Sequence, residues 1–197
     1  ESDINDAMGG RPYYWLGNNA ILAKTVPEGR GEAPVAKAAP AGPVVQESAG
    51  EKTTLRTYQD LLQNPHDEDL FEHYATAELQ RIDVSTGKAK PFAKPGMLAG
   101  ASPSPDGQYV LVETISRPFS YLVPYYRFPT AYDLYTADGA FVRQVDQQPL
   151  IEQLPQGFGA VPEGKRRISW RSDKPATLYW VEARDGGDPK RDAPVRD

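Results

Sequence analysis

The sequence contains no cysteine among its 197 residues, and it has only two histidines and two methionines. Disulfide bonds and cysteine-ligated zinc sites are therefore excluded. No apolar run approaches the roughly 20 residues that a membrane-spanning helix needs. No signal peptide is visible, but the chain begins at Glu1 rather than at Met. We therefore expect a chain that was processed or cut from something longer.

The sequence also has no excess of basic residues over acidic ones. Lysine and arginine together number 22 against 27 aspartates and glutamates, which gives a net charge of −5. Proteins that read the nucleic-acid backbone usually present a basic face, and here only the short run Lys165-Arg166-Arg167 is locally basic. We expect no nucleic-acid partner and no membrane partner, and no sequence pattern calls for a cofactor.

Patterns typical of catalytic or metal sites are weak. The pattern Gly-x-Ser-x-Gly of a nucleophilic serine does not occur, and the nearest approach, around Ser102, lacks its final glycine. We interpret Ser102 as part of a turn that enters a strand. His66 and His73 are seven residues apart and would share a helix face, but their spacing matches no strong metal motif. A solvated helix face is the simpler interpretation, so we assign neither a catalytic nor a metal site.

Glycine and proline are abundant, at 17 and 19 residues, which favours short elements joined by turns. Residues 27–52 are rich in Pro, Ala and Gly and lack aromatics, so we expect a flexible surface excursion there. A short helical insertion is predicted over residues 57–75. It comprises one helix at Thr57–Gln63, ended by Asn64-Pro65, and a second at Asp67–Ala75 with acidic residues in its first turn.

The rest of the sequence predicts strands that come in pairs. Each pair turns at a polar stretch, usually with the glycine that a tight hairpin needs, and the pairs alternate between two types along the chain. The predicted hairpins cover residues 14–24, 79–93, 103–113, 132–142 and 169–182.

Four strands then make one repeated unit, as in the blades of a β-propeller. We predict an all-β fold, an incomplete β-propeller of about two and a half four-stranded antiparallel blades, formed by residues 1–197 as one partial domain. Because a closed propeller needs at least four blades, the natural protein is expected to be longer. Open blade edges would invite self-association.

The stretch Arg117–Pro129 is the most unusual in composition. It holds five aromatic residues, two arginines and three prolines within thirteen residues. In one interpretation it is a binding loop, in which Arg117 and Arg127 offer planar forks to a carboxylate and the tyrosines offer hydroxyl groups. In the other, the aromatic rings pack between neighbouring blades and the arginines form structural ion pairs.

Five stretches of the sequence carry a family resemblance: Lys24–Gly31, Leu62–Thr76, Ser102–Gly107, Arg117–Pro129 and Trp170–Trp180. They resemble bacterial and plastid peptidases of the prolyl oligopeptidase family, and the glutamyl endopeptidase-like branch in particular. The resemblance covers most of the chain, and the aromatic stretch is its most specific part.

The resemblance implies the N-terminal propeller of a two-domain serine peptidase, whose C-terminal α/β-hydrolase domain would hold the catalytic triad. The chain itself would be non-catalytic: it would gate substrate access and contact an acidic group of a peptide substrate through Arg117, Arg127, Tyr125 and Tyr126. A periplasmic or secreted bacterial location is expected. The alternative is a non-enzymatic propeller that serves as a protein-interaction module.

Overall fold

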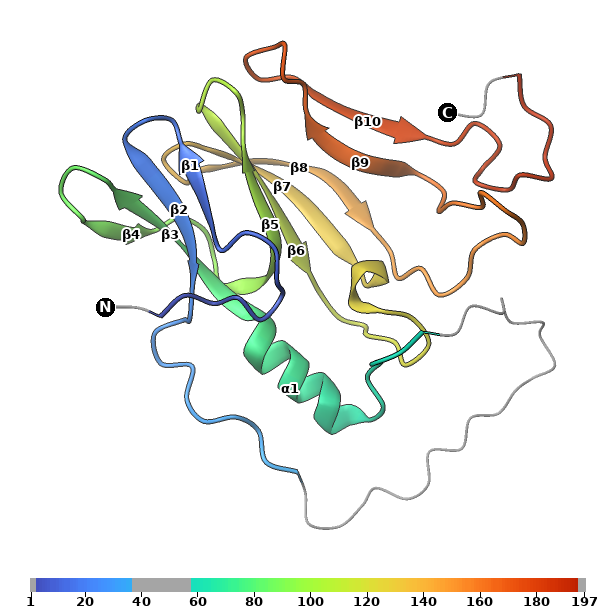
Figure 1. The fold of residues 1–197 in the computed structure, drawn as a ribbon, viewed down its shortest axis with the longest axis horizontal. Coiled ribbons are helices and arrows are strands. Elements are labelled where there is room, and N and C mark those ends of the chain that lie inside the picture. Colours follow the sequence, from blue (N-terminus) through green and yellow to red (C-terminus); the bar gives the residue numbers. More distant parts are fainter. Residues whose placement is uncertain (1–2, 37–57, 195–197) are drawn as a thin grey trace.

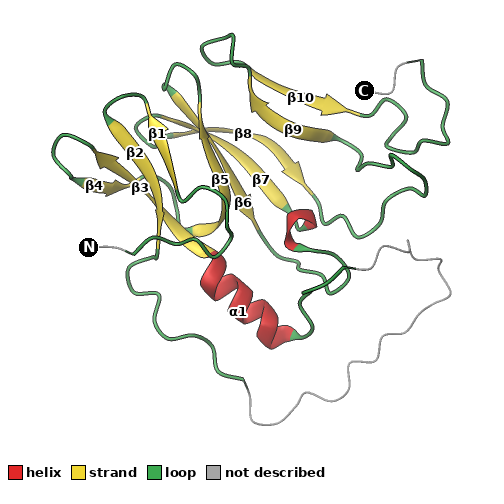
Figure 2. Ribbon diagram, viewed as in Figure 1, coloured by secondary structure: helices red, strands yellow, loops and turns green. Residues whose placement is uncertain are grey.

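The computed structural model describes residues 3–36 and 58–194. Its strands are β1 (Tyr13–Leu16), β2 (Ala20–Thr25), β3 (Thr76–Asp83), β4 (Ala89–Pro91), β5 (Gly96–Pro103), β6 (Tyr109–Ile115), β7 (Thr130–Thr136), β8 (Phe141–Gln148), β9 (Lys165–Trp170) and β10 (Leu178–Glu182). One α-helix, α1 (Pro65–Ala75), and one 3-10 helix, η1 (Tyr125–Arg127), complete the described elements (Figure 1). The expected all-β class with a short helix is confirmed (Figure 2).

The strands form two antiparallel meanders and one separate hairpin. The first meander contains β1–β4 and the second β5–β8, and the hairpin is β9–β10. All five predicted hairpins are present. Pairing of Thr76 and Ala77 with Met97 and Gly96 joins the meanders into one eight-stranded sheet. Within the described residues this sheet does not close on itself, so the propeller stays a prediction.

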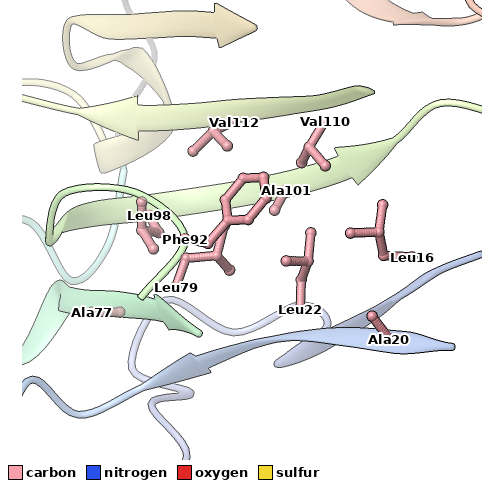
Figure 3. Packing of buried hydrophobic residues seen from close by; sticks show 10 residues of the cluster. All are labelled: Leu16, Ala20, Leu22, Ala77, Leu79, Phe92, Leu98, Ala101, Val110 and Val112. Carbon is pink, nitrogen blue, oxygen red and sulfur yellow. The ribbon is translucent and has the colours of Figure 1, made fainter. Parts of the chain in front are cut away.

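The two meanders pack face to face around the larger hydrophobic core (Figure 3). Side chains of β1, β2 and β3 face those of β5 and β6, as alternation along a half-buried strand requires. The buried members of this core are Leu16, Ala20, Leu22, Ala77, Leu79, Phe92, Leu98, Ala101, Val110 and Val112. Burial of apolar side chains from both meanders is what holds them together.

The β9–β10 hairpin is attached to the second meander at both of its ends. The indole Nε1 of Trp170 donates to the carbonyl oxygen of Ser102 at 2.8 Å. The backbone N–H of Asp106 donates to the carbonyl oxygen of Pro175 at 3.0 Å. At the other end, Gln148 Nε2 donates to the carbonyl oxygen of Lys165 at 2.8 Å. The third strand pair thus follows the second meander in space as it does in the sequence (Figure 1).

Helix α1 has a complete N-cap and continues directly into β3. Asn64 Oδ1 accepts the backbone N–H of Asp67 at 3.0 Å, and proline occupies the first helical position. The predicted helix at Asp67–Ala75 is therefore confirmed. The other predicted helix, Thr57–Gln63, is wrong: residues 58–63 are not helical, and Asp60 has a φ of 55°. Thr57 itself lies outside the described residues.

Two further expectations concern the flexible excursion and membrane-spanning helices. Residues 37–52, most of the predicted excursion at 27–52, lie outside the described residues. In the part that the structure describes, no helix is long and apolar enough to cross a membrane.

Candidate functional site

The aromatic stretch Arg117–Pro129 forms a loop between β6 and β7, and we call it the aromatic loop. Its base is closed by the backbone N–H of Ser116, which donates to the carbonyl oxygen of Pro129 at 2.9 Å. The loop contains η1 and lies beside α1, where the two share a second hydrophobic cluster. A surface loop with joined ends, packed by its own side chains, is a common carrier of function.

Two phenylalanines of the aromatic loop are structural. Phe119 and Phe128 are buried, and their ring centroids lie 5.1 Å apart. Both contact Phe71 of α1 edge to face, at 5.3 and 5.9 Å. These are favourable aromatic geometries, so the rings hold the loop against the helix. These two rings are therefore part of the architecture, as one interpretation expected, but they pack against helix α1 and not between neighbouring blades.

The guanidinium of Arg117 is enclosed by three carboxylates of α1. Its Nη1 donates to Glu68, its Nη2 to Asp69 Oδ1 at 3.1 Å, and its Nε to Glu72 Oε2 at 2.8 Å. The hydrogen bond to Glu72, followed by that to Glu68, raises the pKa of Arg117. The guanidinium carbon also lies 4.6 Å from the ring centroid of Phe119. The structure thus places Arg117 in an ion-pair network that joins the aromatic loop to α1.

Arg127, at the end of η1, has a different environment. Its guanidinium carbon lies 5.4 Å from the ring centroid of Tyr58, a cation–π arrangement. Among the described residues no carboxylate lies within ion-pairing distance of it. The backbone of Arg127 is fixed, because its carbonyl oxygen accepts the N–H of Ile151 at 3.0 Å. A half-buried arginine on a fixed backbone, without an acidic partner, can pair with an anionic group from outside.

Tyr125 and Tyr126 precede Arg127 in η1 and lie at the surface. Tyr126 is 65% exposed, and the two ring centroids are 6.0 Å apart. Tyr125 also lines a small hollow of about 90 Å³ together with Phe71 and Phe128. The structure therefore brings three of the four predicted site residues together in η1, and it places Arg117 apart from them in the network with α1.

A half-buried pair of titratable side chains, Glu113 and Tyr132, went unnoticed in the sequence. Glu113 of β6 lies opposite Gly100 of β5 and Tyr132 of β7. A Cβ on Gly100 would lie 3.5 Å from Glu113 Oε1, so the carboxylate covers this glycine. Burial raises the pKa of Glu113, and burial with the charges of Glu113 and Asp146 raises that of Tyr132 to about 12. The only sequence signal was a charged residue near the end of an apolar strand.

A larger cleft of about 700 Å³ lies between residues 148–155 and β9. The basic run Lys165-Arg166-Arg167 forms part of its lining, which the sequence presented only as a short cluster of charges. Among the described residues no group of three or more His, Cys, Asp or Glu side chains is arranged to hold a metal ion. At η1 and at this cleft, the side chains available for binding are arginines, which suit recognition of anions.

Comparison with curated proteins finds two plant relatives that match nearly the whole chain. The chain is 42% identical over 186 residues to "Probable glutamyl endopeptidase, chloroplastic" of Oryza sativa subsp. japonica. It is 39% identical over 186 residues to the protein of the same name from Arabidopsis thaliana. Each match covers 94% of this chain. No family model matches the chain, and no solved structure matches it.

The matches cover 20% and 19% of the two relatives, so the chain spans about a fifth of their length. Both names include the chloroplast, and they give no support to the expected bacterial periplasm. The names do support the peptidase part of the resemblance seen in the sequence. The chain is a homologue of one segment of proteins that are named glutamyl endopeptidases.

Proposed function

We propose that this chain is a propeller segment of a longer serine peptidase of the prolyl oligopeptidase family, in the glutamyl endopeptidase-like branch. The observation that carries the proposal is identity of 42% and 39% over 94% of the chain with proteins of that name. The chain has no Gly-x-Ser-x-Gly pattern. The nucleophile would therefore lie in a C-terminal α/β-hydrolase domain of the longer protein, with this segment covering it.

The strand topology supports this proposal. Two four-stranded meanders pack face to face, and a third strand pair follows the second meander. Repeated four-stranded units of this kind are what a propeller is built from. In a peptidase, such a ring would restrict entry to peptides and unfolded segments, and this gating is the role we assign to the chain.

Within this function, η1 is the part that would contact substrate. Arg127 would pair with an acidic group of the peptide, and Tyr125 and Tyr126 would provide exposed rings beside it. Arg117 has three carboxylate partners of its own. We therefore assign Arg117 the task of holding the aromatic loop in place, and Arg127 the task of recognising the carboxylate.

The test uses the longer protein and two peptides that differ only by Glu or Gln before the cleaved bond. Because a hydrogen bond to a charged group contributes about 1.5–3 kcal/mol, Arg127→Ala should lower kcat/KM for the Glu peptide about tenfold or more. The Gln peptide should change little. Arg143→Ala, at an exposed position on β8, serves as the control. An equal loss for both peptides would remove Arg127 from substrate recognition.

A further inference from the structure

A second basic surface lies outside η1, in the cleft of about 700 Å³ described above, which we call the basic cleft. Its lining residue Ile151 donates its backbone N–H to the carbonyl oxygen of Arg127 at 3.0 Å. One wall is the segment 148–155 that follows β8. The other wall is formed by the start of β9 and by residues 186–191. Four cations line the cleft, Lys165, Arg166, Arg167 and Arg191, against three carboxylates, Glu152, Glu163 and Asp188.

Lys165 is held by groups of its own protein. Its Nζ donates to the carbonyl oxygen of Val145 at 3.1 Å, lies 3.6 Å from Asp146 Oδ1, and sits 4.8 Å from the ring centroid of Trp180. On the opposite wall, Glu152 accepts a hydrogen bond from Ser120 at 2.6 Å. Arg191 also has a partner, since its Nε lies 3.9 Å from Asp188 Oδ2. Lys165, Glu152, Arg191 and Asp188 therefore all contact groups of the protein itself.

Arg167 differs because a β-bulge sets its position. Arg166 pairs with Val181 and Ser169 pairs with Tyr179, so two residues of β9 lie opposite one residue of β10. The bulge keeps Ile168 buried while Arg167 lines the cleft with an exposed side chain. Arg167 has a φ of 53°, which is rare for a residue other than glycine. Among the described residues no carboxylate lies within ion-pairing distance of it.

The wall at residues 186–191 is preformed. Gly187 has a φ of 80°, and a Cβ there would lie 2.0 Å from the carbonyl oxygen of Val161. The Val161 N–H in turn donates to the carbonyl oxygen of Gly187 at 3.1 Å. Only glycine permits this close approach of two backbones. A rigid wall reduces the entropy lost when a ligand binds in the cleft.

We propose that the basic cleft binds an acidic peptide segment, with Arg167 pairing with one of its carboxylates. Leu150, Ile151 and Leu154 line the cleft beside the cations, and they suit apolar side chains of the same segment. The carboxylates Glu152 and Glu163 disfavour a densely charged polyanion such as nucleic acid. The proposal takes its ligand class, a peptide, from the proposed function, but it places the contact outside η1.

Binding is tested with the 197-residue chain by fluorescence anisotropy at low salt. The probe is a labelled extended peptide of alternating Glu and Leu, compared with its Gln counterpart. Arg167→Gly removes the side chain while the backbone keeps its left-handed conformation without strain. We expect the Glu peptide to bind more tightly than the Gln peptide. Arg167→Gly should weaken Glu-peptide binding about tenfold, the scale of one lost charge-assisted hydrogen bond.

Three further variants make the outcomes distinct. Arg167→Lys should retain part of the affinity because it keeps the charge, and Arg143→Gly should bind as the wild type does. Equal binding of the two peptides, or unchanged binding by Arg167→Gly, overturns the proposal. If Arg127→Ala alone abolishes Glu-peptide binding, the cleft proposal fails while the η1 site stands. If Arg167→Gly alone abolishes Glu-peptide binding, the cleft proposal stands and does not depend on the proposed substrate contact of Arg127.

Discussion

At the scale of single residues, Glu113 of β6 is a carboxyl group whose charge is disfavoured by burial. Because burial raises its pKa in the folded protein, the unfolded chain releases the proton at lower pH than the folded chain does. The free energy of unfolding therefore falls as pH rises above the ordinary value of 4.5. Below that value the carboxyl is protonated in both states, and the penalty disappears.

Glu113→Gln should accordingly stabilise the chain at neutral pH, because the amide resembles the protonated acid in shape and carries no charge. We expect a gain on the order of 1 kcal/mol in the free energy of unfolding, the scale on which burial of a polar group changes stability. Urea denaturation at a series of pH values measures it, with the exposed Glu163→Gln as control. A gain that persists unchanged below pH 4 would show that desolvation of the charge is not the cause.

At the scale of elements, the ion-pair network of Arg117 connects two parts of the chain that lie more than forty residues apart. Arg117→Ala would leave Glu68, Asp69 and Glu72 close together on α1 without a counter-charge. Exposed ion pairs contribute about 0.2–1 kcal/mol each, and the carboxylates would then repel one another. We expect Arg117→Ala to lower the free energy of unfolding by about 1 kcal/mol.

Urea denaturation at low and at high salt measures this loss. Because ions screen exposed charges, the effect of Arg117→Ala should shrink as salt increases. Arg143→Ala is the matched control, since Arg143 is exposed on β8 and has no carboxylate within ion-pairing distance in the described part of the chain, and it should change stability by less than about 0.5 kcal/mol. Equal losses in the two variants would mean that the network contributes nothing beyond packing of the arginine stems.

Local signals predicted most of the elements correctly. The hairpins were predictable because glycine and aspartate mark tight turns between apolar strands, and α1 because Asn64 and Pro65 form a local helix start. The predicted helix at Thr57–Gln63 failed because tertiary contacts override local preference there. Tyr58 lies under the Arg127 guanidinium and Leu62 packs into the second hydrophobic cluster, so the segment stays non-helical against the aromatic loop.

The candidate site was predictable only in its residue types. The sequence predicted Arg117 and Arg127 together as binding residues, because both have planar guanidinium groups and lie within one unusual stretch. Their roles depend on what lies beside them, and the acids around Arg117 are brought there by the packing of Phe71 against Phe119. The cleft around Arg167 was hidden for a similar reason, since a bulge set by pairing across β9 and β10 exposes it.

At the scale of the whole molecule, the faces of the first meander are unequal. One face carries the core that it shares with β5 and β6. The other presents the aromatic side chains of Tyr13 and Trp15, which are 52% and 55% exposed. Successive residues of β1 thus place apolar or aromatic side chains on both faces, as in strands that are covered on both sides. If the meanders are blades of a ring, a further meander of the longer protein would cover this second face.

Oxidative footprinting read by mass spectrometry tests this arrangement. Tyr13 and Trp15 should be modified readily in the 197-residue chain and several-fold more slowly in the longer protein, because a covering blade would exclude solvent from both rings. Leu16, buried in the shared core, should remain unreactive in both proteins and serves as the control. Equal modification of Tyr13 and Trp15 in the two proteins would leave the first meander without a neighbour on that face. No blade would then pack against that face of the first meander, and the ring on which the gating function depends could not form.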